Sequence, residues 1–193
     1  MKSEFFTEPV SKKEAADILL KYHYLKDISK TFRSGYNLGL FKGNPDDVFI
    51  GDPCGVCIFT SLPVPEIAVG AFGLDRDDQD GLFELSRLCL HPIEQSEEHN
   101  LAGWFVVRAI KWLQSVTAVR AIISYADSSF HAGTVYRATN WTYCGLTAPK
   151  FDYVDGDQIQ SRGKSKSGDT RDRTQKHRFV KVFDKSLTLL WKP

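Results

Sequence analysis

The sequence predicts a single α/β domain over residues 1–193, with a mixed, mostly antiparallel sheet, a central strand–helix–strand unit and flanking helices. Three observations support this fold class. Two strand-like runs follow an N-terminal helix, a strongly apolar helical run lies between two further strand runs, and two short apolar runs close the chain. A chain of 193 residues, 42% of them hydrophobic, can bury one core and suits one domain better than two.

The first elements are a helix and two strands. Residues 11–22 carry apolar side chains at helical spacing, and Ser11 with Glu14 three residues later has the pattern of a capping box. Residues 36–41 and 55–59 are apolar runs separated by turn residues. They therefore predict two neighbouring strands.

The centre of the chain predicts a crossover unit. Residues 83–90 alternate apolar and polar side chains, which is typical of a strand, and a polar loop follows from His91-Pro92 to Asn100. Residues 101–116 predict a helix that is apolar on more than one face and packs against a sheet. Residues 120–125 predict a buried strand parallel to the first.

The C-terminal part predicts shorter elements. Residues 132–139 indicate a short helix, and residues 141–144 begin a further strand. Residues 152–178 are polar and rich in Gly, Ser and Lys, so they predict a mobile loop, with its basic part over residues 156–178. Residues 179–183 and 187–191 predict a closing strand pair.

The charge of the chain is unevenly distributed. The formal net charge is +1, but residues 161–178 contain seven Lys or Arg and two Asp, so this window carries +5 and the rest −4. Such a segment can follow a phosphate backbone, although many basic runs are solvated surface loops. The residues expected to contact DNA are Arg162, Lys164, Lys166, Arg171 and Arg173.

Composition also excludes several classes. No stretch approaches the length of a membrane helix and the N-terminus has no apolar core of a secretory signal, so we expect a soluble intracellular protein. The four cysteines do not form a dense disulfide framework, which favours a reducing compartment. Cys54 and Cys57 form a single C-x-x-C, for which packing at the start of a strand is favoured over metal or redox chemistry.

Two features of the central unit could bind a ligand. The helix start at residues 100–103 presents free N–H groups that suit a phosphate, and Ala102 and Gly103 leave room for close approach. An ordinary crossover without a ligand explains the same pattern. Asp127 follows the returning strand, where α/β sheets build their sites, but it could equally cap the short helix after it.

Two further candidates lie outside that helix. Arg87 stands in an apolar strand and needs a carboxylate or phosphate partner if it is buried, or it faces solvent. His23 and Tyr24 could supply an acid–base group or a stacking surface. The alternative is a tyrosine packed over a helix C-terminus, with the histidine near the helix dipole.

Residues 124–145, SYADSSFHAGTVYRATNWTYCG, resemble the signature of the Mom family of phage DNA-modification proteins. The resemblance is carried by Tyr125-Ala126-Asp127, Gly133-Thr134-Val135-Tyr136, Ala138, Asn140-Trp141, Tyr143 and Gly145. ELSRL at residues 84–88 and HYL at residues 23–25 are similar to further family landmarks, in the same order along the chain.

The resemblance implies a fold similar to that of GNAT acyltransferases, with acetyl-CoA or another acyl-CoA as cofactor. It implies conversion of adenine in double-stranded DNA to an N6-carbamoylmethyl-type adenine, which blocks host restriction in the host cytoplasm. Some family members have been linked to a metal, with iron the candidate, but its ligands stay unassigned here; the oligomeric state is open, a dimer included. By motif position, the catalytic residues are His23, Tyr24, Arg87 and Asp127, and the cofactor-binding residues are Leu90, Asn100, Leu101, Ala102 and Gly103.

This chemistry is compatible with the residues. The adenine N6 amine is a poor nucleophile, and Asp127 could accept its proton while Arg87 holds a phosphate or a developing negative charge. The base must leave the duplex and stack on an aromatic ring, for which Tyr24, Tyr136 and Trp141 are candidates. Two alternatives stay open: an ordinary N-acyltransferase acting on a small amine or protein, and a non-catalytic DNA-binding or host-interaction protein.

Overall fold

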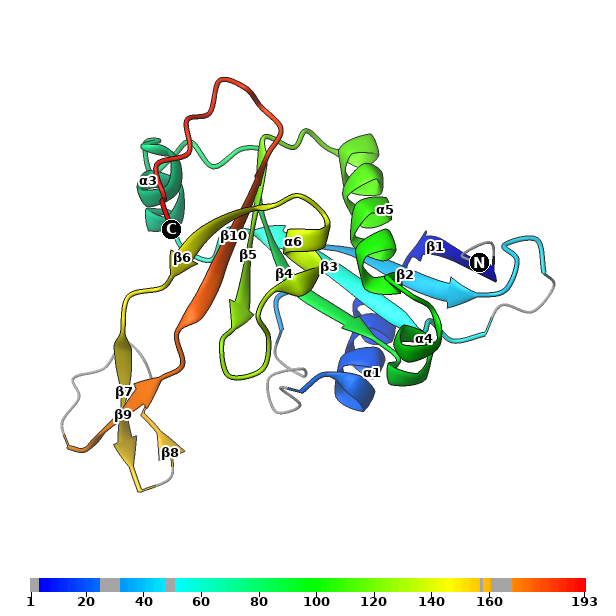
Figure 1. Cartoon of the computed structure of the whole chain (residues 1–193), viewed down its shortest axis with the longest axis horizontal. Helices are drawn as coiled ribbons and strands as arrows, with labels where there is room; N and C mark the ends of the chain where they lie inside the picture. Colours follow the sequence, from blue (N-terminus) through cyan, green and yellow to red (C-terminus); the bar gives the residue numbers. More distant parts are fainter. Residues whose placement is uncertain (1–3, 25–31, 48–50, 157, 161–167) are drawn as a thin grey trace.

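Figure 1 shows the computed structural model of the chain, which describes residues 4–24, 32–47, 51–156, 158–160 and 168–193. Within this part, seven strands form the main sheet, in the order β1-β2-β3-β4-β5-β10-β6. Only β4 and β5 pair in parallel; the other pairs are antiparallel. The strands are β1 (Phe5–Pro9), β2 (Tyr36–Lys42), β3 (Gly55–Ser61), β4 (Leu82–Leu90), β5 (Ala121–Asp127), β6 (Thr142–Leu146) and β10 (Lys176–Val182).

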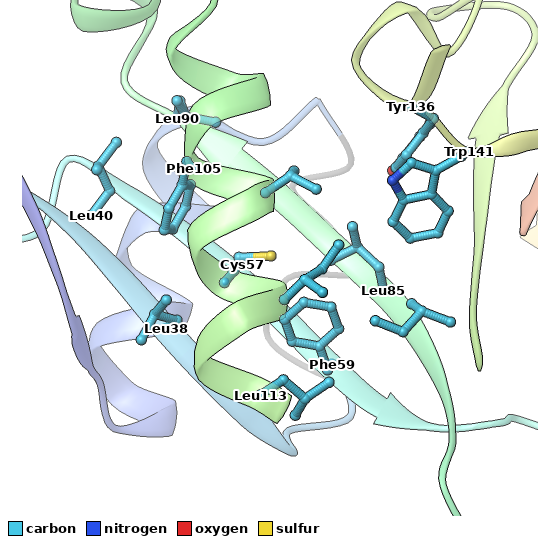
Figure 2. Packing of buried hydrophobic residues seen from close by; sticks show 14 of the residues in the cluster. Leu38, Leu40, Cys57, Phe59, Leu85, Leu90, Phe105, Leu113, Tyr136 and Trp141 are labelled. Atoms are coloured by element: carbon cyan, nitrogen blue, oxygen red, sulfur yellow. The ribbon is translucent and has the colours of Figure 1, made fainter. Parts of the chain in front are cut away.

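Helices cover both faces of the main sheet. They are α1 (Lys12–Tyr22), α3 (Glu66–Phe72), α4 (Pro92–Glu97), α5 (Leu101–Val116) and α6 (Thr134–Ala138). On β3, Cys57 and Phe59 pack toward α5, whereas Val56 and Ile58 pack toward α1. Figure 2 shows the core beneath α5, where Phe105 and Leu113 meet the sheet. The mixed, mostly antiparallel α/β sheet with flanking helices is confirmed.

A small sheet projects from one edge of the main sheet (Figure 1). Its strands are β7 (Lys150–Asp155), β8 (Gln158–Ile159) and β9 (Thr170–Arg173), in the order β8-β7-β9. We call it the arm. Residues 174–175 connect β9 to β10, so the arm is joined directly to the strand that lies between β5 and the edge strand β6.

A bulge in β4 separates this strand from β5. The register with β3 passes from Phe59↔Leu85 to Ile58↔Arg87, which leaves Ser86 as an extra residue. The parallel register of β4 with β5 ends at Leu85↔Ser124. The later residues of the two strands therefore diverge, and we call this place the split.

Several predicted elements are confirmed. The helix over residues 101–116 has those bounds, and α1 begins after the Ser11 capping box, whose hydrogen bonds join Ser11 and Glu14 at 2.8 and 3.2 Å. The elements that the sequence analysis does not foresee are β1, α3, α4 and the three strands of the arm. In α4, the expected polar loop is instead a short helix, which His91 caps by accepting the Ile93 N–H at 3.3 Å.

Two C-terminal predictions are wrong. In its described part, the expected loop over residues 152–178 contains most of β7, all of β8 and β9 and the start of β10. Backbone pairing forms these strands although most side chains of β9 are exposed. Asp152 and Arg173 form an ion pair at 3.4 Å, and Arg178 lies 4.7 Å from the ring of Trp191. Residues 187–191 form no strand, since their apolar side chains pack against the α3 side of the core.

Candidate functional site

A cavity of about 580 Å³ opens at the split. Its walls come from the C-terminal end of α1, the second half of β4, the start of α5, the end of β5 and the segment that leads into α6. The cavity brings together seven of the residues that the sequence predicts, namely His23, Tyr24, Arg87, Leu90, Ala102, Asp127 and Tyr136.

The bulge decides which side chains of β4 share a face. Without an extra residue, positions 84 and 87 would point to opposite sides of the sheet. With Ser86 bulged, Glu84 and Arg87 lie on one side, while Leu85 and Leu88 pack toward the α5 core. The Arg87 guanidinium donates to the Ser86 carbonyl oxygen at 2.6 Å. Arg87 therefore faces the cavity and not bulk solvent.

His23 is held at the end of α1, where its N–H donates to the Leu19 carbonyl oxygen at 3.0 Å. Its ring stacks on Tyr24, with centroids 4.5 Å apart. Burial, assisted by the positive charges of Arg87 and His131, lowers the pKa of His23 to about 4. The imidazole is therefore neutral at pH 7 and can accept a hydrogen bond.

Asp127 lies opposite these rings at the end of β5. Its carboxylate accepts the Ser129 N–H at 3.1 Å, so it caps the turn after β5 and not α6, which begins at Thr134. Burial and the negative charge of Asp127 raise the pKa of Tyr24, and the positive charge of Arg87 opposes this shift. Within the described residues, no ion pair joins Asp127 to Arg87; the two share the cavity.

Two of the three residues predicted for base stacking are buried, namely Tyr136 and Trp141. Trp141 is 6% exposed and packs edge-on against Tyr136 with centroids 5.2 Å apart (Figure 2). A base cannot stack on Trp141, because protein atoms cover its ring. Tyr136, 7% exposed, reaches the cavity wall, and its hydroxyl lies 2.8 Å from that of Ser124. Burial raises the pKa of Tyr136, so this phenol stays protonated.

The sequence analysis misses four further residues that line the cavity, namely Glu84, Phe130, His131 and Lys176. Burial raises the pKa of Glu84 although the positive charges of Arg87 and Lys176 oppose this shift. Glu84 is the first residue of the ELSRL landmark at residues 84–88, so the family motif could have identified it as a site residue. Lys176 was counted only as part of the basic window.

The start of α5 forms the other end of the cavity, through Leu90 and Ala102. Leu101 and Gly103 are buried in the helix packing, so they do not contribute side chains to the cavity wall. Asn100 has a left-handed backbone (φ 59°) and its side chain does not cap the helix. The first N–H groups of α5 are therefore not used by a capping side chain.

This end of the cavity is not basic. Glu94 and Glu97 lie in α4 immediately before α5, and Glu94 pairs with Lys42 at 2.9 Å. A phosphate bound here would depend on backbone N–H groups and the dipole of α5 more than on basic side chains.

The cysteines do not form a reactive centre. Cys57 is fully buried in the α5 core, and burial raises its pKa, while the pKa of Cys54 is raised to about 11. These thiols stay protonated, which confirms packing as their role. In the described ranges, no three His, Cys, Asp or Glu side chains are grouped as metal ligands, so the residues present do not fit the iron that the family resemblance implies.

The basic residues are distributed over the arm and β10. Arg171 and Arg173 lie on β9, and Arg162, Lys164 and Lys166 lie outside the described residues. Among the helices that the structure describes, none has both the length and the apolar character needed to cross a bilayer.

Solved structures with similar folds are acetyltransferases. NAA60 of Arabidopsis thaliana in complex with acetyl-CoA is 10% identical, with a TM-score of 0.59 over 93% of this chain and 99% of that one. The ribosomal-protein-S18-alanine N-acetyltransferase of Escherichia coli is 11% identical, with a TM-score of 0.55 over 93% and 94%. A GNAT-family acetyltransferase of Streptococcus pneumoniae is 12% identical, with a TM-score of 0.53 over 93% and 100%. These matches confirm the GNAT-like fold.

Sequence comparisons give the family. No curated protein sequence is significantly similar to the chain. A family model described as the Mom protein family matches residues 4–189, nearly the whole length. The match includes the cavity residues from His23 to Lys176 and confirms the resemblance carried by residues 124–145. The chain belongs to the Mom protein family.

Proposed function

We propose that this protein is an acyl-CoA-linked transferase that modifies adenine N6 in DNA with a carbamoylmethyl-type group, and so protects phage DNA from restriction in the host cytoplasm. The observation that carries this proposal is the shared cavity, which joins the start of α5 to the carboxylate of Asp127 through the split. Family membership supports the same reading.

The donor would enter from the α5 side. Ala102 and Leu90 line that end, and the N–H groups at the start of α5 would hold the pyrophosphate of an acyl-CoA. When bound, the acyl-CoA would supply an activated two-carbon group as a thioester, and the amide nitrogen of a carbamoylmethyl group would come from a separate nitrogen donor. The Tyr136 hydroxyl lines the cavity and stays protonated, so it can donate a proton there.

The acceptor would enter from the other side of the sheet. Its N6–H would donate to the Asp127 carboxylate, which takes the proton as the new N6–carbon bond forms. The neutral imidazole of His23 offers a hydrogen-bond acceptor, and the Tyr24 ring, 41% exposed, lines the entrance of the cavity. The Arg87 guanidinium would stabilise negative charge that develops in the cavity.

The arm would hold the DNA backbone. Arg171 and Arg173 are placed on β9, next to the segment that contains Arg162, Lys164 and Lys166. Contacts of this type depend on salt and tolerate any sequence. They would position double-stranded DNA so that one base can be rotated out of the stack into the cavity.

The test is mass analysis of nucleosides from the DNA of cells that express the protein. We expect a deoxyadenosine of increased mass, which is absent when Asp127→Asn is expressed to the same level. Simple acyl transfer to N6 would give an amide of different mass, so the same experiment identifies the group. Unmodified deoxyadenosine alone in the wild-type sample would refute the proposal.

A second candidate is an ordinary N-acyltransferase. It is favoured by the solved structures of similar fold, which include a ribosomal-protein-S18-alanine N-acetyltransferase. This candidate predicts acyl-CoA binding and acylation of an amine without DNA binding. Retention of a DNA duplex by the purified protein, with a salt-dependent affinity, distinguishes the two.

A further inference from the structure

A row of aromatic rings leads from the surface of the protein to the buried His23. The ring of Tyr24 lies 4.5 Å from that of His23, at 21° between planes, and 4.6 Å from that of Phe130, at 33°. Exposure rises along the row, from 7% for His23 to 41% for Tyr24 and 58% for Phe130. Phe130 therefore forms the outer end of the row, at the rim of the cavity.

Phe130 is fixed in this place by its backbone. The N–H groups of Phe130 and His131 donate to the Asp127 carbonyl oxygen at 3.0 and 2.8 Å. Ser128 donates its N–H and its hydroxyl to the carbonyl oxygen of Gln175, before β10, at 3.1 and 2.8 Å. A turn with these bonds presents the ring in a defined direction, so its exposure does not arise from a loose loop.

The same rim carries a positive charge. Lys176 pairs in register with Asp127 at the start of β10, and it lines the cavity with Phe130. A flat apolar ring beside a cation suits a nucleic acid, in which stacked bases alternate with phosphates. A protein that extrudes a base must also compensate the gap left in the stack. In DNA-bending proteins, apolar side chains such as Phe enter between base steps, so a ring of this kind can occupy a place in the stack.

We propose that Phe130 enters the DNA stack at the position that the target adenine leaves, while Tyr24 forms the surface along which the base passes toward Asp127. This inference rests on the proposed function. It assigns Phe130 as a positioning residue for duplex substrate, with no part in the bond that forms at N6. Its role is therefore needed only when the adenine starts inside a duplex.

The test compares the same DNA strand alone and annealed to its complement. Each reaction contains the purified protein, acyl-CoA and a cell extract. For Phe130→Ala we expect duplex modification to fall by about tenfold or more. Modification of the single strand should stay within about twofold, because no base has to leave a helix. Phe130→Trp, which keeps a large flat ring, should restore modification of the duplex.

Val116→Ala is the matched control, since Val116 is 51% exposed at the far end of α5 from the cavity. It should change neither substrate. Equal losses on both substrates with Phe130→Ala, or an unchanged duplex rate, would overturn the inference. A wild-type protein that modifies only the single strand would also overturn it. If the wild type modifies neither form of the DNA, the proposed function itself fails. This outcome differs from failure of the inference alone, in which the wild type still modifies DNA.

Discussion

Replacing His23 by phenylalanine should remove a loss of stability that occurs at acidic pH. The folded protein lowers the pKa of His23 from 6.5 to about 4, chiefly by burial. Between these pH values the unfolded chain binds a proton that the folded protein excludes. Stability conferred by the neutral ring is therefore present above pH 6.5 and is lost as the pH falls toward 4.

The size of the effect follows from this pKa change. Linkage gives a loss of about 2 kcal/mol between pH 7 and pH 5, and about 3 kcal/mol once the pH is below the folded pKa. Little discount for solvent is needed, since the side chain is 7% exposed. Phenylalanine keeps a ring against Tyr24 but binds no proton, so the variant should lack this part of the pH dependence.

Urea unfolding at pH 7, 6 and 5, followed by circular dichroism, measures the change. The free energy of unfolding of His23→Phe minus that of the wild type should increase by about 2 kcal/mol from pH 7 to pH 5. In Arg87→Gln, the pKa of His23 should move back toward its ordinary value and the pH dependence should weaken. A difference between wild type and His23→Phe that stays constant with pH would refute the reasoning.

Three further predictions concern the site and its support. Asp127→Asn should lower activity by about a hundredfold or more, because an amide does not accept the N6 proton. It should leave the melting temperature unchanged, because the amide oxygen still accepts the turn hydrogen bond. Asp127→Ala should lower activity in the same way and also cost about 1 kcal/mol of stability. Arg171→Gln should reduce the salt slope of DNA binding by about one, whereas Lys111→Gln, on the exposed face of α5, should not. Gly133→Ala should destabilise the protein by about 3 kcal/mol in a thermal melt, because φ is +71° and the added Cβ would lie 2.2 Å from the Phe179 ring.

The central elements could be predicted because local pattern and tertiary environment agree. Helix α5 is apolar on the faces that pack, and the capping box of α1 is a local signal. The arm could not be predicted, since its exposed strands need no apolar face and therefore have the composition of a loop. The tail at residues 187–191 alternates like a strand but packs on α3 instead.

The site was predicted in part for a similar reason. His23, Tyr24, Arg87 and Asp127 came from the family motif, and the cavity brings them together. Their faces could not be derived from alternation, because the bulge at Ser86 shifts the pattern of β4 by one residue. For Trp141, the motif gave a wrong prediction. This tryptophan was predicted to form a stacking surface, but its ring is buried in the core.

The hydrogen bonds between Ser128 and Gln175 connect the link that follows the arm to the turn after β5. Gln175 lies directly between β9 and β10, so the backbone that leaves the arm also anchors the turn that carries Phe130. If the arm binds DNA as proposed, the modified base would lie at a fixed number of nucleotides from the site where the arm contacts the backbone. Lengthening the link after Arg173 should therefore move the modified position.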